Sequence, residues 1–228
     1  CTMKYTLTSS GAKFIYLSNI DGETSNAVQG GDSIYIYGAQ LEQGSYPTSY
    51  IPTSGSSATR QADTANGGGN SEVFNDSEGV LYAEIAGLAD GTSKVITLGD
   101  GTNSNRVQIF YHASNVLYGN IVSGGNGQVT GFTYNGSIDL FKKVVVKYKS
   151  NDCAFWVNGF EIETDTTATM PSGLNELMFD NGTGSSNFYG NTKEIAYYDT
   201  ILTDEELEVL TSYETLTELV TELNLNEL

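Results

Sequence analysis

The sequence predicts an all-β protein whose main part is an antiparallel β-sandwich, and three observations support this prediction. Short runs of β-branched and aromatic residues recur from Gly79 to Tyr198 with no helical pattern between them. The turns between these runs carry Asp-Gly, Asn-Gly and Gly-Gly-Asn-Gly, which favour tight connections between antiparallel strands. The 228 residues also include 15 Tyr, 9 Phe and 26 Gly, a composition typical of aromatic-rich strands joined by glycine turns.

The N-terminal part, residues 1–52, is predicted to hold the last strands of a smaller, truncated β-sandwich domain. Strand-like runs occupy residues 5–8, 13–18 and 33–37. Because so few strands cannot bury an apolar face alone, we expect the rest of this domain to lie upstream of Cys1 or to come from a neighbouring chain. Pro47 and Pro52 favour extended backbone, and residues 53–72, rich in Ser, Gly, Asn and Ala, are predicted to be a linker.

The predicted sandwich spans residues 73–202. Its strands are expected at 80–86, 93–98, 106–111, 116–122, 128–134, 141–149, 154–157, 161–164, 176–179 and 193–198. Asn158 and Gly159 have the chemistry of a two-residue type I′ hairpin turn. The strand at 141–149 carries the basic cluster of the chain, which we expect to form a solvated face or a blunted sheet edge, with a glycan- or phosphate-binding patch as the alternative. This cluster consists of Lys142, Lys143, Lys147 and Lys149.

A short amphipathic helix is predicted for the C-terminal region, residues 203–228. Thr203 is a suitable N-cap, and three carboxylates follow it in the first turn, where the helix dipole favours negative charge. Apolar residues spaced by threes and fours form one stripe. The stripe consists of Leu207, Leu210, Tyr213, Leu216, Val220 and Leu223. We expect it to pack on the sandwich or on the same helix of a neighbouring subunit, and the second arrangement would make the chain a homo-oligomer.

The charge and the cysteines exclude several classes of partner and structure. With 28 acidic and 10 basic residues the formal charge is −18, which disfavours nucleic acid and anionic membranes as partners. Two cysteines this far apart make neither a disulfide framework nor a zinc site. Cys153 lies in an apolar run and is expected to be a buried thiol. Cys1 could be a lipidated residue, but we favour a fragment of a longer protein.

The sequence offers little for catalysis, so we expect no enzyme. His112 is the single histidine and is expected at the surface at the end of a strand. Glu161 and Glu163 are predicted to share a strand face, which is the arrangement that a retaining glycosidase would require of two carboxylates. They directly follow a hairpin turn, however, and are more typical of a solvent-exposed strand.

The connector between the two predicted domains resembles a phrase that recurs in virion proteins of tailed bacteriophages. The matching stretches are Gly-Ala-Gln-Leu-Glu at 38–42, Thr-Ser-Tyr-Ile-Pro-Thr at 48–53 and Thr-Arg-Gln-Ala-Asp at 59–63. In those proteins the phrase closes one β-sandwich and leads into the next. The resemblance therefore implies a tail fibre, tail spike or head appendage, located at the virion surface.

From residue 73 to 211 the chain resembles the laminin-G/concanavalin A-like jelly roll. The hairpin Phe-Trp-Val-Asn-Gly at 155–159 and the closing phrase at 188–199 carry this resemblance. The stretch Thr-Ile-Leu-Thr-Asp-Glu-Glu-Leu at 200–207 matches the capped turn and short helix with which the family often ends. The resemblance implies the fold but not a ligand, because this fold serves lectins, glycosidases and spacers alike.

Two loops are the candidate sites that the resemblance suggests. Calcium at the sandwich rim would take oxygen ligands from the loops at 100–105 and 180–187, with Asp100 and Asp180 as its acidic ligands. Glycan contacts are expected from the same loops. The candidate glycan-binding residues are Asp100, Asn103, Asn105 and Asn187. Ordinary turn chemistry is the alternative for both loops, and Trp156 is expected in the core rather than at a sugar.

Together these observations predict a non-enzymatic structural or adhesive module of a phage virion. Its expected partners are host-surface polysaccharides or glycans, or other virion proteins. A bacterial surface or extracellular filament subunit with a lectin-like domain is the alternative, and a polysaccharide-degrading enzyme is a third possibility.

Overall fold

The computed structural model describes residues 49–58, 65–87, 91–129 and 131–212. The chain divides into two compact units, Cys1–Gln61 and Ala62–Leu228. In the first unit the described residues 49–58 form no helix or strand. The strands predicted at 5–8, 13–18 and 33–37, and the apolar stripe from Tyr213 onward, lie outside the described residues.

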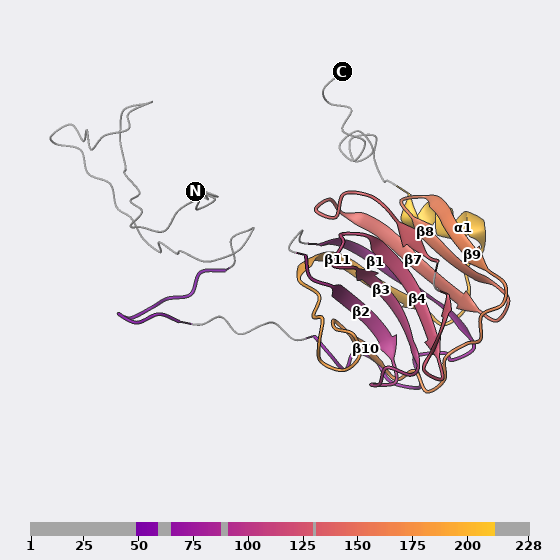
Figure 1. Ribbon diagram of the computed structural model, residues 1–228, viewed down its shortest axis with the longest axis horizontal. Coiled ribbons are helices and arrows are strands. Elements are labelled where there is room, and N and C mark those ends of the chain that lie inside the picture. The colour runs from indigo at the N-terminus through magenta and orange to yellow at the C-terminus, as the bar shows by residue number, and fades with distance from the viewer. Residues whose placement is uncertain (1–48, 59–64, 88–90, 130, 213–228) are drawn as a thin grey trace, which may run out of the picture. The chain divides into compact units, whose positions relative to one another are not determined.

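The second unit is a sandwich of two antiparallel sheets that stack face to face (Figure 1), which confirms the predicted all-β fold. The five-stranded sheet consists, in spatial order, of β11 (Gly190–Tyr198), β1 (Glu78–Gly87), β7 (Lys142–Lys149), β8 (Cys153–Val157) and β9 (Phe160–Asp165). The six-stranded sheet consists of β10 (Glu176–Met178), β2 (Lys94–Gly99), β3 (Arg106–Tyr111), β4 (Leu117–Ser123) and β5 (Asn126–Val129), with β6 (Thr133–Tyr134) paired to β4. The strand predicted at 128–134 is thus divided between β5 and β6.

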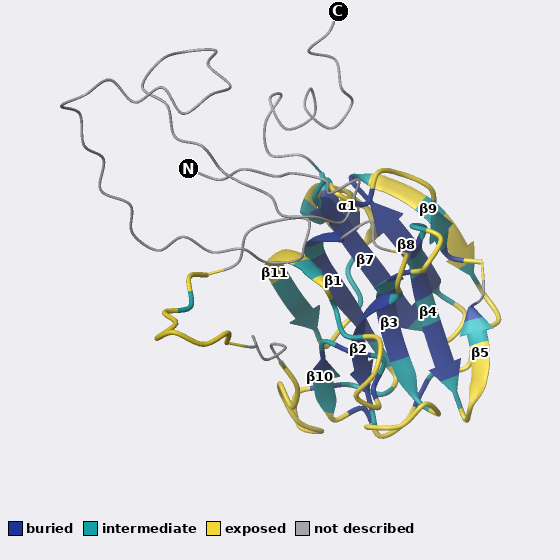
Figure 2. Ribbon diagram, turned by 60° about the vertical axis from the view of Figure 1, so that its left-hand side comes forward, coloured by how far each residue is buried: buried dark blue, intermediate teal, exposed yellow. Residues whose placement is uncertain are grey.

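The main core lies between the sheets and is filled by alternate residues of their central strands. In Figure 2 these strands are largely dark blue, the colour of buried residues. Phe132 stacks on Phe155 with ring centroids 5.7 Å apart. Gly119 allows the sheets to approach closely, because a Cβ at this position would lie 2.8 Å from a ring carbon of Phe155 and 2.9 Å from Val146. The predicted buried thiol is confirmed, since Cys153 is 1% exposed in this core.

The hairpin between β8 and β9 has the turn that the sequence predicts. Asn158 and Gly159 adopt φ of 52° and 84°, the left-handed region that a type I′ turn requires at both positions. The Asn158 side chain also accepts a 2.9 Å hydrogen bond from the backbone N–H of Lys143, which fastens the turn to β7.

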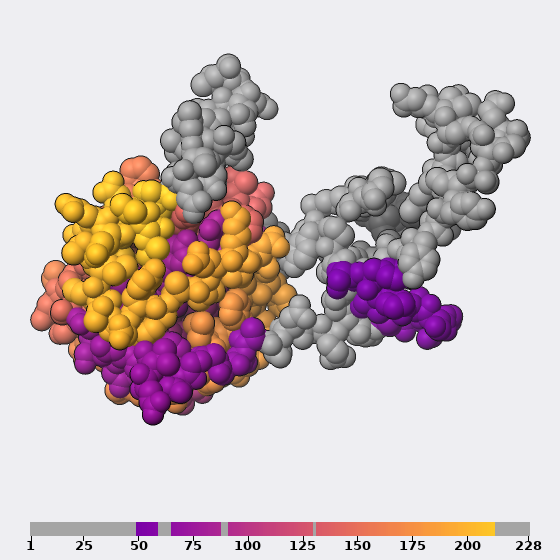
Figure 3. All heavy atoms as spheres, turned by 180° about the vertical axis from the view of Figure 1, so that it is seen from behind, coloured from indigo at the N-terminus to yellow at the C-terminus, as the bar shows by residue number. Residues whose placement is uncertain are grey.

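The helix α1 (Asp204–Thr211) begins where the sequence predicts. Thr203 caps it, and Glu206 completes a capping box by accepting a hydrogen bond from the Thr203 backbone N–H. The helix packs on the outer face of the five-stranded sheet and forms a second apolar cluster there. This cluster consists of Val80, Tyr82, Val145, Ala154, Trp156 and Leu207. Trp156 is therefore in a core, as predicted. Viewed from behind, the residues around α1 form the yellow part of the surface (Figure 3).

The lysines of β7 do not form a solvated face or a sheet edge, so that prediction is wrong. β7 is the central strand of its sheet, and Lys142, Lys143 and Lys147 are only 1%, 9% and 5% exposed. Lys143 Nζ donates to the backbone oxygen of Ser212, 3.1 Å away, just after α1. The helix covers the face that carries Lys143 and Lys147, whereas Lys142 pairs with the core residue Ile85 on the other face. The sequence of the strand alone does not reveal this cover.

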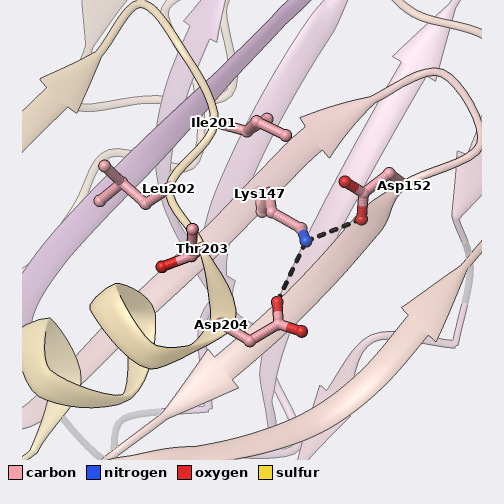
Figure 4. A pocket seen from close by; sticks show the side chains of 6 residues that line it. All are labelled: Lys147, Asp152, Ile201, Leu202, Thr203 and Asp204. Atoms are coloured by element: carbon pink, nitrogen blue, oxygen red, sulfur yellow. Dashed lines mark hydrogen bonds and ion pairs between the residues drawn. The ribbon is translucent and has the colours of Figure 1, made fainter.

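Lys147 fastens the first turn of α1 to the sheet. Its Nζ lies 2.7 Å from an Asp152 carboxylate oxygen and 3.3 Å from one of Asp204, as Figure 4 shows. Burial lowers the pKa of Lys147, but the hydrogen bonds and charges of the two aspartates raise it more, so this pKa lies above its ordinary value.

The chain joins the sandwich earlier than the predicted domain start at residue 73. Gly68 exchanges backbone hydrogen bonds of 3.2 and 2.8 Å with Leu177 of the edge strand β10. The Phe179 N–H donates to the Ala65 carbonyl at 3.0 Å. The last residues of the predicted linker therefore cover part of the β10 edge. Among the described residues, no helix is long and apolar enough to cross a membrane.

Candidate functional site

The outer face of the six-stranded sheet carries polar and aromatic side chains where β3 and β4 lie side by side. In both strands aliphatic residues that point into the core alternate with residues that point outward. We call the polar and aromatic residues among these outward positions the ladder face. It consists of Arg106, Gln108, Phe110, Tyr118 and Asn120.

A chain of side-chain hydrogen bonds crosses this face from β4 to the loop after β10. Asn120 Nδ2 donates to Gln108 Oε1 at 3.2 Å, and Gln108 Nε2 donates to Thr97 Oγ1 at 3.0 Å. Thr97 Oγ1 in turn donates to the backbone oxygen of Asp180 at 2.6 Å. Thr97 and Gln108 are buried, whereas Asn120 is half-buried, so the open end of the chain lies on β4.

An aromatic pair stands beside the amides. Phe110 and Tyr118 are direct cross-strand partners, and their rings stack with centroids 5.0 Å apart and an interplanar angle of 11°. His112 lies against the Tyr118 ring at 5.7 Å and is exposed just after β3, as predicted. Both stacked rings are half-buried, so their outer parts are accessible.

The two loops that the sequence singled out meet at Arg106. Its Nη1 donates to the side-chain oxygen of Asn103 in the first loop and, at 3.0 Å, to the backbone oxygen of Asn181 in the second. Burial lowers the pKa of Arg106, and the charge of Asp100 raises it in part. Arg106 therefore positions Asn103 at the edge of the ladder face.

Asp100 and Asn105 organise the first loop from within. Asp100 Oδ1 accepts from the N–H and hydroxyl of Thr102 at 2.8 and 2.6 Å, and its Oδ2 accepts from Asn105 Nδ2 at 2.9 Å. Partial burial raises the pKa of Asp100, but these hydrogen bonds together lower it below its ordinary value. Asn105 Oδ1 accepts from the Gly124 N–H at 3.1 Å, so both residues have structural partners.

Asp180 is buried at the base of the second loop, with an exposure of 2%. One carboxylate oxygen accepts from Asn66 Nδ2 at 2.9 Å and the other from the Gly182 N–H at 2.6 Å. Asp180 thus connects the start of the sandwich to the second loop. Asn187 is half-buried, and within the described residues its side chain makes no hydrogen bond.

The calcium site expected from Asp100 and Asp180 stays a prediction. The carboxylate oxygens of both residues accept hydrogen bonds from N–H or O–H donors, so both side chains have a structural role in their loops. Across the described residues, no group of three or more acidic, histidine or cysteine side chains is placed to hold a metal ion.

Glu161 and Glu163 are both exposed on β9, which fits the prediction of a solvent-exposed strand. Ile162 between them packs against the main core. The pairing of this strand with β8 contains a register shift between Phe155 and Trp156.

Sequence reasoning missed the amides and the aromatic pair of the ladder face. The signal was present, because the strands at 106–111 and 117–122 alternate aliphatic residues with polar and aromatic ones. To place these residues on one surface, however, the pairing of Gln108 with Asn120 and of Phe110 with Tyr118 must also be known.

The fold is similar to solved sialidase-associated domains, whereas sequence comparison finds no relative. No known protein family matches the chain, and no curated protein is significantly similar to it in sequence. A leech intramolecular trans-sialidase is 19% identical with a TM-score of 0.51, over 68% of this chain and 27% of the enzyme. The CBM40 domain of the Ruminococcus gnavus IT-sialidase is 16% identical with a TM-score of 0.50, over 65% of this chain and 95% of the domain.

A second structure of that CBM40 domain contains α2,3-sialyllactose and has the same identity and TM-score, over 65% of this chain and 94% of the domain. The chain spans only about a quarter of the length of the leech enzyme. At these identities the similarity shows a shared jelly-roll fold, like that of carbohydrate-binding domains.

Proposed function

We propose that the sandwich is a non-catalytic glycan-binding module and that glycans bind on the ladder face. The observation that carries this proposal is the aromatic pair of Phe110 and Tyr118 beside the amides of Gln108 and Asn120. Aromatic rings offer an apolar contact surface, and amides donate to and accept from hydroxyl groups. The Asn103 amide at the edge of this face extends the site toward the first loop.

The similarity to carbohydrate-binding domains supports the same proposal, although it indicates no particular sugar for this chain. The CBM40 domain binds sialyllactose in its own structure. We propose for this chain a comparable role, in which a β-sandwich presents one open sheet face to a glycan.

We further propose that the module belongs to an appendage at the surface of a phage virion, where it contacts host glycans or other virion proteins. The resemblance of residues 38–63 to the connector phrase of virion proteins supports this setting. We also propose that the chain self-associates, for example as a trimer. Apolar side chains that a neighbouring subunit could cover are Val209 on α1 and Phe160 on β9, which are 76% and 69% exposed. Light scattering on the full chain measures the assembly state.

A glycan array tests the binding proposal. The full chain is compared with Tyr118→Ala and with Phe160→Ala, which removes an exposed aromatic ring from β9 instead. We expect Tyr118→Ala to lose most of the signal and Phe160→Ala to keep it. Equal loss in both variants, or no signal from the unmodified chain, would contradict the proposal.

The same array, run in calcium and in EDTA, tests whether glycan binding depends on calcium. Because hydrogen bonds within the protein already hold the carboxylates of Asp100 and Asp180 in place, we propose that glycan binding does not require calcium to order the two loops. Signals are expected to be equal in both buffers. Selective loss in EDTA would contradict this proposal and support the calcium site that the sequence suggests.

A further inference from the structure

The ladder face has one positive charge, and its surroundings are acidic. Among the outward residues of β2, β3 and β4, Arg106 is the single cation. Asp100 acts on it electrostatically, and Asp180 lies buried below the second loop without a cationic partner among its hydrogen bonds. Glu176 is also near, since a Cβ on Gly101 would lie 3.0 Å from its Oε1. The chain as a whole carries a formal charge of −18.

The guanidinium of Arg106 is poorly available to a sugar carboxylate. Nη1 already donates to the Asn103 side chain and to the backbone oxygen of Asn181. Nε is buried and has no hydrogen-bond partner among the described residues. Bidentate pairing with a carboxylate uses two neighbouring N–H donors, and each such pair on Arg106 includes either Nη1 or Nε. A carboxylate would therefore have to displace an existing bond or reach a buried atom.

The other end of the face suits an uncharged sugar. The hydroxyl of Tyr118 makes no hydrogen bond within the described part of the chain, and its ring is half-buried against Phe110. Asn120 uses one amide hydrogen on Gln108, which leaves its second amide hydrogen for a sugar hydroxyl. Apolar sugar faces and hydroxyl groups find partners here without any charge.

We infer that the ladder face selects neutral glycans and discriminates against sialylated ones, with Asp100 and Glu176 as the residues that set this preference. The inference rests on the glycan-binding function proposed above and concerns the chemical class of its ligand. It separates this chain from the similarly folded CBM40 domain that contains sialyllactose.

Calorimetric titration of the full chain tests the inference with matched ligands. The neutral glycan with the strongest array signal is compared with the same glycan carrying one α2,3-linked sialic acid. We expect the neutral glycan to bind tighter by about tenfold or more, because like charges brought together at a binding surface oppose association. Tighter binding of the sialylated form would overturn the inference and leave the binding function standing, whereas binding of neither would overturn both.

Charge variants test whether Asp100 and Glu176 cause the preference for neutral glycans. Glu176→Gln, alone and combined with Asp100→Asn, is expected to bring the affinities for the neutral and the sialylated glycan closer together. The control is Glu161→Gln with Glu163→Gln, which changes the net charge as much as the double variant but on the exposed strand β9. An unchanged ratio in the Glu176 and Asp100 variants, or equal narrowing in the control, would overturn their role. Glu176→Gln alone keeps the hydrogen bonds of Asp100 and so guards against a folding artefact.

Discussion

The outer faces of the two sheets differ in what covers them. On the five-stranded sheet α1 covers an apolar cluster contributed by β1, β7 and β8, and Lys143 and Lys147 reach from the same face to α1 and the residue after it. On the six-stranded sheet Gln108 and Asn120 point outward instead and form a hydrogen-bonded chain that ends on the loop after β10. The first face is closed by a second small core, whereas the second is held by polar contacts and stays partly open along β3 and β4.

This difference predicts which outer face contributes more to stability and which one binds the ligand. Burial of apolar surface under a helix contributes more to stability than single hydrogen bonds do. The covered face should therefore respond to substitution mainly through unfolding, and the ladder face mainly through ligand affinity. The following predictions test this division, beginning with the largest effect.

Leu207→Ala should cost the most stability. Leu207 is fully buried between α1 and the sheet, and a buried Leu→Ala change costs about 2–5 kcal/mol. Guanidinium unfolding measures the loss. Val209→Ala on the same helix is the control, because that side chain is 76% exposed, and little change is expected. A loss below about 1 kcal/mol at Leu207 would mean that α1 does not stabilise this face.

Thr97→Val should reduce both stability and glycan affinity. The substitution keeps the shape but leaves Gln108 Nε2 and the Asp180 carbonyl without their partner, at a cost of about 1–3 kcal/mol. Urea unfolding and calorimetric titration measure the two effects. Thr192→Val, on the exposed part of β11, serves as the control. Unchanged affinity in Thr97→Val would separate the hydrogen-bonded chain from the binding site.

Lys147→Met should destabilise the covered face without affecting binding. The cost is about 1–2 kcal/mol, because Lys147 is buried but Asp152 and Asp204 remain partly solvated after its loss. Lys193→Met should cost less, because the side chain of Lys193 in its pair with Glu84 is 50% exposed. Unfolding free energies at several pH values provide the measurement.

The pH dependence of that effect has a definite sign. Since the pKa of Lys147 is raised in the folded protein, its contribution is complete below the unfolded value, about 10.4. It is lost as the pH rises further, through the folded value. The difference between the unmodified chain and Lys147→Met should therefore be constant near neutral pH and shrink in strong alkali. A difference that grows in alkali would contradict the ion pair.

Asp100→Asn should have the smallest effect. The pKa of Asp100 is lowered in the folded protein, so its contribution is present above the unfolded value, about 3.9. It is lost as the pH falls through the lower folded value. At neutral pH we expect a loss below about 1 kcal/mol, because the group is largely solvated. Thermal unfolding at neutral pH and at pH 3 measures the difference, and an equal loss at both would exclude the charge as its cause.

Features encoded locally were predictable from the sequence. Thr203 capped the predicted helix, and Asn158 with Gly159 formed the predicted turn, because each depends on neighbours within a few residues. The burial of Lys147 was not predictable in this way, since its cover comes from Asp204, 57 residues away. Asp180 was noticed as an acidic loop residue, yet its partner Asn66 lies 114 residues earlier in the chain.

The candidate site was predictable only in part for the same reason. The loops at 100–105 and 180–187 were found by composition, but their meeting point at Arg106 is a tertiary contact. The alternation in β3 and β4 contained the ladder face, but strand pairing had to be known before Phe110 and Tyr118 formed a pair.

Nuclear magnetic resonance of the full chain, labelled with ¹⁵N and titrated with the glycan selected on the array, tests the two-face account most directly. We predict that the side-chain amide signals of Gln108 and Asn120 and the backbone signals around Phe110 and Tyr118 shift on binding, while those of α1 and Trp156 stay in place. Shifts confined to α1, β8 and β9, with the ladder face unchanged, would contradict it.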